Sequence, residues 1–92
     1  MPKIYHSKRF EKSFKKILRS GKFDNYKLDK ILIELERGTK LEIKYRDHQL
    51  TGDMSQYREC HVENDLLLIY EVSKLGNYIE VVDIGSHSDL FG

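Results

Sequence analysis

The chain begins with a short alternating stretch and then changes to the period of a helix. Lys3–Ser7 alternates as a short strand does, whereas from Phe10 onward apolar residues recur every three or four positions, as on one face of a helix. A second stripe of the same period follows Gly21. The two stripes consist of Phe10, Phe14, Ile17 and Leu18, and of Leu28, Ile31, Leu32 and Leu35. The pattern therefore predicts two amphipathic helices.

Capping residues mark the ends of these helices. Ser7 or Ser13 can cap the first and Asp24 the second, because a short polar side chain accepts a hydrogen bond from the free main-chain N–H groups there. Gly21 and Gly38 are natural stops. The two helices are thus expected to form an αα-hairpin, the second running from about Asp24 to the residue before Gly38.

Three strand-like segments follow a long connection over residues 39–56. They are Tyr57–Val62, Leu66–Val72 and Tyr78–Ile84. The links between them are short enough for hairpins, and the middle segment is apolar almost throughout, as a central strand is. The order strand, helix, helix, three strands predicts one α+β domain over residues 1–92, with two N-terminal helices packed on one face of a small antiparallel sheet.

Charge divides the chain into two halves, although its net charge is only +1. Residues 1–46 hold fourteen Lys or Arg and six Asp or Glu, a balance of +8, whereas residues 47–92 hold two and nine, a balance of −7. This asymmetry indicates a surface for a polyanion or an acidic partner; basic solvated helix faces opposite an acidic sheet edge are the alternative. The candidate phosphate contacts on the polar face of the first helix are Lys12, Lys15, Lys16 and Arg19.

Several classes of protein are disfavoured. No stretch approaches the roughly 20 apolar residues of a membrane span, and the first ten residues lack the apolar core of a signal peptide. The single cysteine, Cys60, cannot form an internal disulfide and fits a reducing compartment. We therefore expect a cytoplasmic location without membrane association.

Three of the four histidines lie in or beside connections. His48 belongs to the long connection, His61 ends the first strand of the meander and His87 follows the last, while Asp65 sits in the turn after His61. In an antiparallel meander the first turn and the end of the third strand share one edge of the sheet. The long connection needs only to fold over that edge to add His48. The fourth histidine, His6, is expected at the surface.

Other interpretations compete with such a cluster. A histidine in a loop is commonly just solvated, and a His/Asp pair can simply cap a turn. Three histidines and an acid can form a zinc site, yet the short ligand spacings of zinc motifs are missing. Cys60 and His61 are neighbours on a strand and point to opposite faces, which argues against a Cys–His dyad and makes Cys60 a core residue.

Two imidazoles can act as base and acid without a metal or an enzyme nucleophile. RNA supplies its own nucleophile: the base removes the proton of a ribose 2′-OH, that oxygen attacks the adjacent phosphate, and the acid protonates the leaving 5′-oxygen. Phe91 in the tail would add a stacking surface for a base. We expect the tail to be ordered, with Ile84 as the last strand residue, a turn at Gly85 and Leu90 packed inward.

These motifs also carry a family resemblance. The segments "DHQLTG", "YRECHV", "LLLIY" and "GSHSDLFG", in this order, resemble the YafQ branch of the RelE/ParE toxins of type II toxin–antitoxin pairs, over roughly residues 41–92. The resemblance implies a RelE-like fold and a bacterial, cytoplasmic endoribonuclease that cuts mRNA on the ribosome without metal or other cofactor. It also implies a cognate DinJ/RelB-like antitoxin, with operator DNA bound only through the toxin–antitoxin complex.

The family's active-site residues fall on matching positions of this chain. They are His48, His61, Asp65, His87 and Phe91. We assign His61 as the general base, oriented by Asp65, and His87 as the general acid. His48 would hold the phosphate or share the role of base. Arg58 alternates away from His61 and is a further candidate phosphate contact.

Two positions depart from the family pattern. Leu66 stands where close relatives often carry Trp, and Gln56 where they often carry Gly. The change at Leu66 leaves room for an alternative function, a RelE-fold binding module that sequesters the ribosome or a protein partner without cleavage. A ParE-like gyrase poison is a third reading, for which the histidines give no reason.

Overall fold

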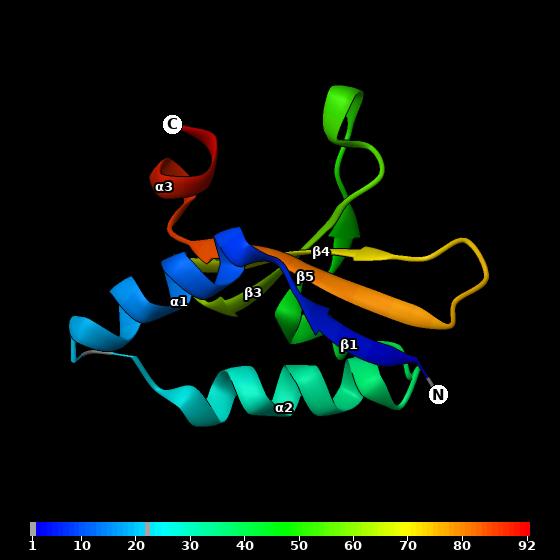
Figure 1. Cartoon of the computed structure of the whole chain (residues 1–92), viewed down its shortest axis with the longest axis horizontal. Coiled ribbons are helices and arrows are strands. Elements are labelled where there is room, and N and C mark those ends of the chain that lie inside the picture. The colour runs from blue at the N-terminus through cyan, green and yellow to red at the C-terminus, as the bar shows by residue number, and fades with distance from the viewer. Residues whose placement is uncertain (1, 22) are drawn as a thin grey trace.

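A computed structural model describes residues 2–21 and 23–92, which form a mixed sheet of five strands with helices around it (Figure 1). The elements in chain order are β1 (Lys3–His6), α1 (Lys8–Arg19), α2 (Asn25–Glu36), η1 (Ile43–Tyr45), β2 (His48–Gln49), η2 (Gly52–Met54), β3 (Arg58–Glu63), β4 (Leu66–Val72), β5 (Tyr78–Gly85) and α3 (His87–Phe91). The strand order is β1-β5-β4-β3-β2. The predicted α+β class and the meander of β3, β4 and β5 are confirmed.

The first strand makes the sheet mixed, whereas we expected an antiparallel one. β1 pairs parallel with β5, with Ile4 opposite Ile79, and the other three strand pairs are antiparallel. Parallel neighbours need a long connection between them, and the chain provides it through both helices and the meander. Four short elements, η1, β2, η2 and α3, also lie where we expected only irregular chain.

Both helices begin at predicted caps. The side chains of Ser7 and Asp24 accept hydrogen bonds from main-chain N–H groups of the first turns of α1 and α2, at 2.9 and 3.0 Å. Gly38 follows α2 with φ +72°, a left-handed conformation that favours glycine. Ser13, the other candidate cap, instead donates a hydrogen bond to Asp83 of β5 at 2.6 Å. This bond ties α1 to the sheet.

One apolar core lies between the helices and one face of the sheet. Its buried members are Phe10, Leu28, Ile31, Leu35, Leu41, Tyr45, Cys60, Val62, Leu68, Tyr70, Ile79, Val81 and Ile84. Full burial of a large apolar side chain contributes roughly 1.5–3 kcal/mol, so both predicted stripes help to hold the fold, apart from Leu18, which is exposed. Burial raises the pKa of the Cys60 thiol, in keeping with its core role. Within the described residues no helix has the length and apolar character to cross a membrane.

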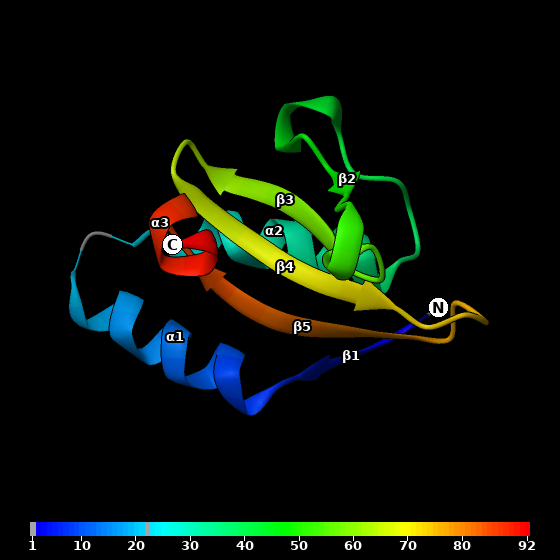
Figure 2. The same ribbon diagram turned by 90° about the horizontal axis from the view of Figure 1, so that it is seen from above.

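The opposite face of the sheet is open between two projections. Figures 1 and 2 show α2 beneath one face, while α3 and the loop that contains η2 stand on the other. Since side chains of a strand alternate, Glu59 and His61 of β3 lie on this open face and Cys60 and Val62 lie in the core. The fold therefore presents His61 on the open face of the sheet.

Candidate active site

The carboxylate of Glu59 lies between two imidazoles on the open face. His48 of β2 is the register partner of Glu59, and His61 lies two residues farther along β3. Glu59 Oε1 is 3.5 Å from His48 Nε2 and 3.7 Å from His61 Nε2. The Glu59 side chain is 9% exposed, against 23% for His61 and 51% for His48. A shielded carboxylate in this place can stabilise the positive charge on whichever imidazole accepts a proton.

A main-chain contact fixes the tautomer of His48. Its Nδ1 lies 2.7 Å from the carbonyl oxygen of Arg46. Because a carbonyl only accepts, Nδ1 carries a proton and donates it, which leaves Nε2 as the nitrogen facing Glu59. Arg46 itself has φ 51° and closes η1, so the chain turns there into β2.

Asp47 holds the loop of His48 on the sheet. Arg58 donates to the Asp47 carboxylate from Nη2 and Nε, at 3.0 and 3.3 Å, and the Tyr70 hydroxyl donates to it as well. Burial, with the hydrogen bond to Asp47, raises the pKa of Tyr70, so its hydroxyl stays a donor. Arg58 alternates away from His61, as predicted. Its guanidinium is occupied by the Asp47 carboxylate, which lies 3.0 Å away.

The C-terminal tail forms the short helix α3, held at its start by Asp65. The main-chain N–H of His87 donates to Asp65 Oδ1 at 3.0 Å. Ser86 and Asp89 form a capping box, in which each side chain accepts from the main-chain N–H of the other at 3.1 Å. These hydrogen bonds lower the pKa of Asp89. The tail is therefore ordered, as we expected, and it is helical, which we did not expect.

Gly85 belongs to β5, whereas we predicted that the strand ended at Ile84 and turned at Gly85. β5 includes Gly85. A Cβ atom on this residue would lie 3.0 Å from Asp89 Cβ, which is too close without a shift of α3. Glycine is thus needed here for the close approach of α3 to the strand, not for a turn.

Phe91 and Leu90 face the sheet from α3. The rings of His87 and Phe91 are tilted by 45° with centroids 5.2 Å apart, so Phe91 supports His87 one helical turn away. Leu90 is half-buried, in agreement with the predicted anchor, while Phe91 is exposed. Both line a hollow of about 250 Å³, together with Ile69 and Tyr57. An aromatic ring beside such a hollow can stack on a base.

The predicted site residues therefore form two groups. His48 and His61 lie with Glu59 on the sheet, whereas Asp65 and His87 meet at the start of α3 and Phe91, at its end, lies beside His87. His61 pairs with Leu67, and Leu67 with Gly85, so the main chain of His61 lies two strand spacings, about 10 Å, from that of Gly85, two residues before His87.

Asp65 does not have the partner that we assigned to it. We expected it to orient His61, but its hydrogen bond goes to His87, and Glu59 is the carboxylate beside His61. The alternation of "YRECHV" places Glu59 and His61 on one side of the strand, a signal that would have identified Glu59. No local signal pairs His48 with Glu59, because that contact depends on the loop returning as β2.

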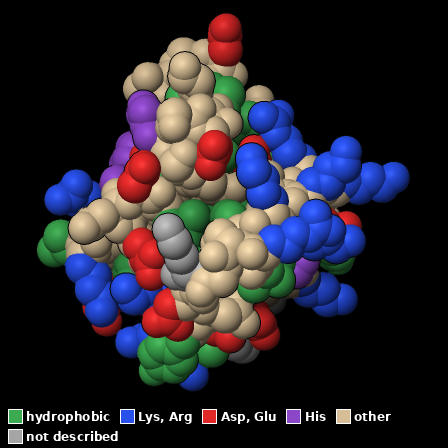
Figure 3. All heavy atoms as spheres, turned by 90° about the vertical axis from the view of Figure 1, so that its left-hand side faces the viewer, with side chains coloured by type: hydrophobic (Ala, Val, Ile, Leu, Met, Phe, Trp, Pro, Cys, Tyr) green, Lys and Arg blue, Asp and Glu red, His purple; other side chains and the backbone are tan. Residues whose placement is uncertain are grey.

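The remaining predicted contacts lie outside this cluster. Lys12, Lys15, Lys16 and Arg19 are all exposed on α1. Figure 3 looks onto the side of the molecule that is leftmost in Figure 1 and shows Lys and Arg side chains at both margins, with acidic side chains between. Leu66, the departure from the family pattern, packs against the core cluster. Among residues 2–21 and 23–92 no three His, Cys, Asp or Glu side chains form a group that could hold a metal ion.

Known proteins resemble this chain over almost its full length. The family model described as "Bacterial toxin of type II toxin-antitoxin system, YafQ" matches residues 2–92. The mRNA interferase toxin YafQ of Escherichia coli (strain K12) is 33% identical over 90 residues, covering 97% of this chain and 95% of that protein. The crystal structure of a metal-bound toxin from Helicobacter pylori has a TM-score of 0.87 and 43% identity, covering 99% of this chain and 100% of that one. A chain of the E. coli DinJ–YafQ toxin–antitoxin complex has a TM-score of 0.88 and 32% identity, covering 99% and 98%.

Proposed function

This chain belongs to the YafQ family of bacterial toxins of type II toxin–antitoxin systems, and we propose that it is an endoribonuclease that cuts mRNA on the ribosome. One observation carries the proposal: His61 and His48 flank Glu59 on the open face, and the main chain of His61 lies about two strand spacings from Gly85, the strand residue that leads into α3. The relative from E. coli is named an mRNA interferase. Imidazoles placed on two sides of a phosphate are suited to acid–base cleavage of RNA.

The proposed reaction is an internal transesterification. His61 takes the proton of the ribose 2′-OH as that oxygen forms a bond to phosphorus. The bond from phosphorus to the 5′-oxygen breaks, and His87 gives a proton to the leaving oxygen. The products are a 2′,3′-cyclic phosphate and a 5′-hydroxyl. Glu59 stabilises the imidazolium of His61, and His48 holds the phosphate or shares the role of base.

The reaction is proposed to need no metal ion. Its nucleophile comes from the substrate, and its proton acceptor and donor come from the chain. The toxin from H. pylori is metal-bound, so the role of a metal in this chain is a question for experiment.

The partners follow from the same proposal. In E. coli, YafQ forms a complex with DinJ, and we infer a cognate DinJ/RelB-like antitoxin for this chain. Operator DNA would be bound only through the toxin–antitoxin complex. Because ribosomes and mRNA are its proposed targets, we infer that the toxin acts in the cytoplasm.

The test is single-turnover cleavage of a defined mRNA on programmed ribosomes, with analysis of both new ends. We expect a 2′,3′-cyclic phosphate and a 5′-hydroxyl from the parent toxin, and no cutting without ribosomes. His61→Ala should reduce the rate by about 10²-fold, the scale of a lost general base. His6→Ala changes an exposed histidine outside the site and should keep the parent rate. A parent toxin that binds ribosomes without cutting would instead identify a sequestering module.

A further inference from the structure

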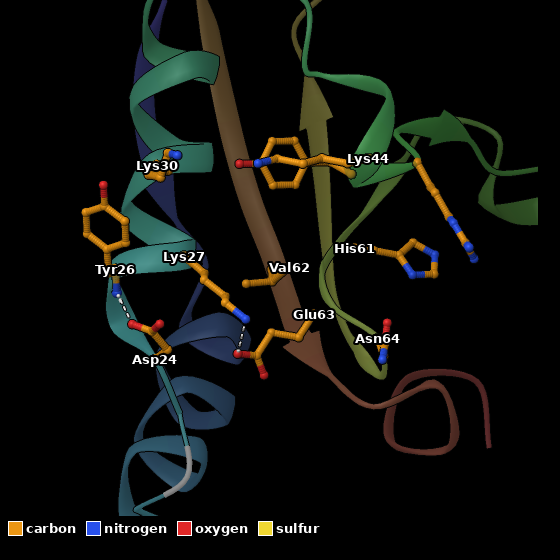
Figure 4. A pocket seen from close by; sticks show the side chains of 11 residues that line it. Asp24, Tyr26, Lys27, Lys30, Lys44, His61, Val62, Glu63 and Asn64 are labelled. Atoms are coloured by element: carbon orange, nitrogen blue, oxygen red, sulfur yellow. Dashed lines mark hydrogen bonds and ion pairs between the residues drawn. The ribbon is translucent and has the colours of Figure 1, made fainter.

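A groove runs along the free edge of β3 on the side of His61. β2 pairs only with the first two residues of β3, so within the described residues no strand pairs with the rest of β3 on this side. The space between this edge and α2 measures about 440 Å³. Figure 4 shows Lys27 and Lys30 of α2 on one wall, Lys44 of η1 across one end and His61 at the opposite rim. We call it the α2–β3 groove.

Positive charge dominates the α2–β3 groove. Its cationic lining consists of Lys27, Lys30, Lys44 and Arg46. Lys27 is paired with Glu63 at 3.2 Å, and Lys44 more loosely with Glu42 at 3.5 Å. The other two cations have no ion pair among the described residues. The remaining carboxylate of the lining, Asp24, is occupied as the cap of α2. The groove therefore keeps cations that are available to an anionic ligand.

Two tyrosine rings lie beside these cations, the exposed ring of Tyr26 and the buried ring of Tyr45. Lys30 Nζ is 5.7 Å from the centre of the Tyr26 ring, and Lys44 Nζ is 5.2 Å from that of Tyr45. Tyr26 is 67% exposed, so one face of its ring is open to a ligand. Ammonium groups that neutralise phosphates, next to rings that stack on bases, are the combination with which proteins bind single-stranded nucleic acid.

A simpler explanation exists for lysines at the edge of a sheet. They protect an unpaired strand from pairing with another chain. That explanation requires neither the tyrosines nor a connection with the acid–base residues. Yet His61 lies at the rim of the groove and also 3.7 Å from Glu59, so the groove adjoins the proposed site of cleavage.

We propose that the α2–β3 groove binds the backbone phosphates of RNA next to the bond that is cut. The proposal rests on the endoribonuclease function proposed above. The phosphates belong either to the mRNA strand that continues from His61 or to ribosomal RNA beside it. Lys30 and Lys44 supply charge, and Tyr26 supplies a stacking surface.

The test compares two double variants with the same change in charge. Lys30→Gln with Lys44→Gln alters the groove, and Lys3→Gln with Lys74→Gln alters exposed lysines of β1 and the β4–β5 hairpin. Single-turnover cleavage on programmed ribosomes gives the half-maximal toxin concentration and the maximal rate. Loss of two phosphate contacts should raise the half-maximal toxin concentration roughly twenty-fold at 0.1 M salt. When the logarithm of this concentration is plotted against the logarithm of the salt concentration, the slope should fall by about 1.4. The maximal rate of the groove variant should equal that of the parent toxin. The control double variant should match the parent in both half-maximal concentration and maximal rate.

Truncated messages identify the source of the phosphates. If they belong to the mRNA, the difference between parent and groove variant disappears when the message is shortened on one side of the cleavage site. If they belong to ribosomal RNA, the difference persists with both truncations. The inference is overturned if the groove variant keeps the parent's half-maximal concentration and salt slope, or if it loses only affinity for the antitoxin. A parent toxin that does not cut at all overturns the endoribonuclease function instead.

Discussion

The main-chain N–H of His87 donates a hydrogen bond to the carboxylate of Asp65, 3.0 Å away. This contact joins the turn after β3 to the start of α3, 22 residues farther along the chain. It satisfies one of the N–H groups that a helix leaves free at its first turn. Asp65 therefore acts through the position of His87, while the carboxylate that acts on His61 is Glu59.

Replacing Asp65 should loosen the start of α3. We expect Asp65→Ala to reduce cleavage about ten-fold and to lower the stability of folding by about 1 kcal/mol, the net value of one hydrogen bond. Asp65→Asn keeps an acceptor oxygen and should retain most of the activity. Amide hydrogen exchange at His87, which should become faster in Asp65→Ala alone, is the direct measurement. If Asp65→Ala loses activity while amide exchange at His87 stays unchanged, Asp65 instead orients His61, as we first assigned.

Single replacements of His87 and Phe91 distinguish a tail that takes part in catalysis from a tail that only stabilises the fold. We expect His87→Ala to keep ribosome binding and the fold but to cut about 10²-fold more slowly, because the leaving oxygen loses its proton donor. Phe91→Ala should lose activity with only a small fall in Tm, since its ring is exposed. If His87→Ala cuts like the parent and Phe91→Ala mainly lowers Tm, the tail is structural.

Removing the Arg58 side chain should lower the stability of the fold and loosen the position of His48. Arg58 and Tyr70 hold Asp47, the residue before His48, so Arg58→Ala leaves a partly buried carboxylate with one donor fewer. We expect a loss of roughly 1–3 kcal/mol in the free energy of unfolding, between the values of exposed and buried ion pairs. The salt dependence of ribosome binding should not change. A flatter salt slope with normal stability would instead support the phosphate contact predicted from the sequence.

Reversing charges on α1 tests the basic face predicted from the sequence. Lys12→Glu with Lys16→Glu should weaken ribosome binding and flatten its salt dependence, because ribosomal RNA phosphates lose their cations. Stability should change by less than about 0.5 kcal/mol, since both side chains are exposed. Lys3→Glu with Lys74→Glu is the matched control. An unchanged slope for the α1 pair would make these lysines ordinary solvated surface.

Treatment with a chelator tests the metal-independent reaction. Toxin incubated with EDTA and freed of it before ribosomes are added should cut at the parent rate, because the substrate provides the nucleophile and two imidazoles move the protons. The measurement is single-turnover cleavage together with the metal content of the protein. Stoichiometric zinc bound through His48 and His61, with activity lost on its removal, would refute this mechanism.

The elements of this fold that depend on local sequence could be predicted. Apolar stripes at helical spacing gave the positions of α1 and α2, and β4 runs over Leu66–Val72 as predicted. Caps such as Asp24 act through groups only a few residues away, so the order of residues is enough to find them. The same holds for the opposite orientations of Cys60 and His61, which follow from alternation within one strand.

The arrangement of the candidate site was decided by contacts between distant segments. The parallel pairing of β1 with β5, the return of the loop as β2 against Glu59, and the bond from His87 to Asp65 each join segments that no local pattern links. Capping residues can mark a helix as short as α3, but only the close approach of Asp89 explains Gly85. The sequence by itself thus determined which elements form and which histidines are available. Tertiary structure decided which carboxylate serves which imidazole, because a side chain's partner depends on the register and packing of whole elements.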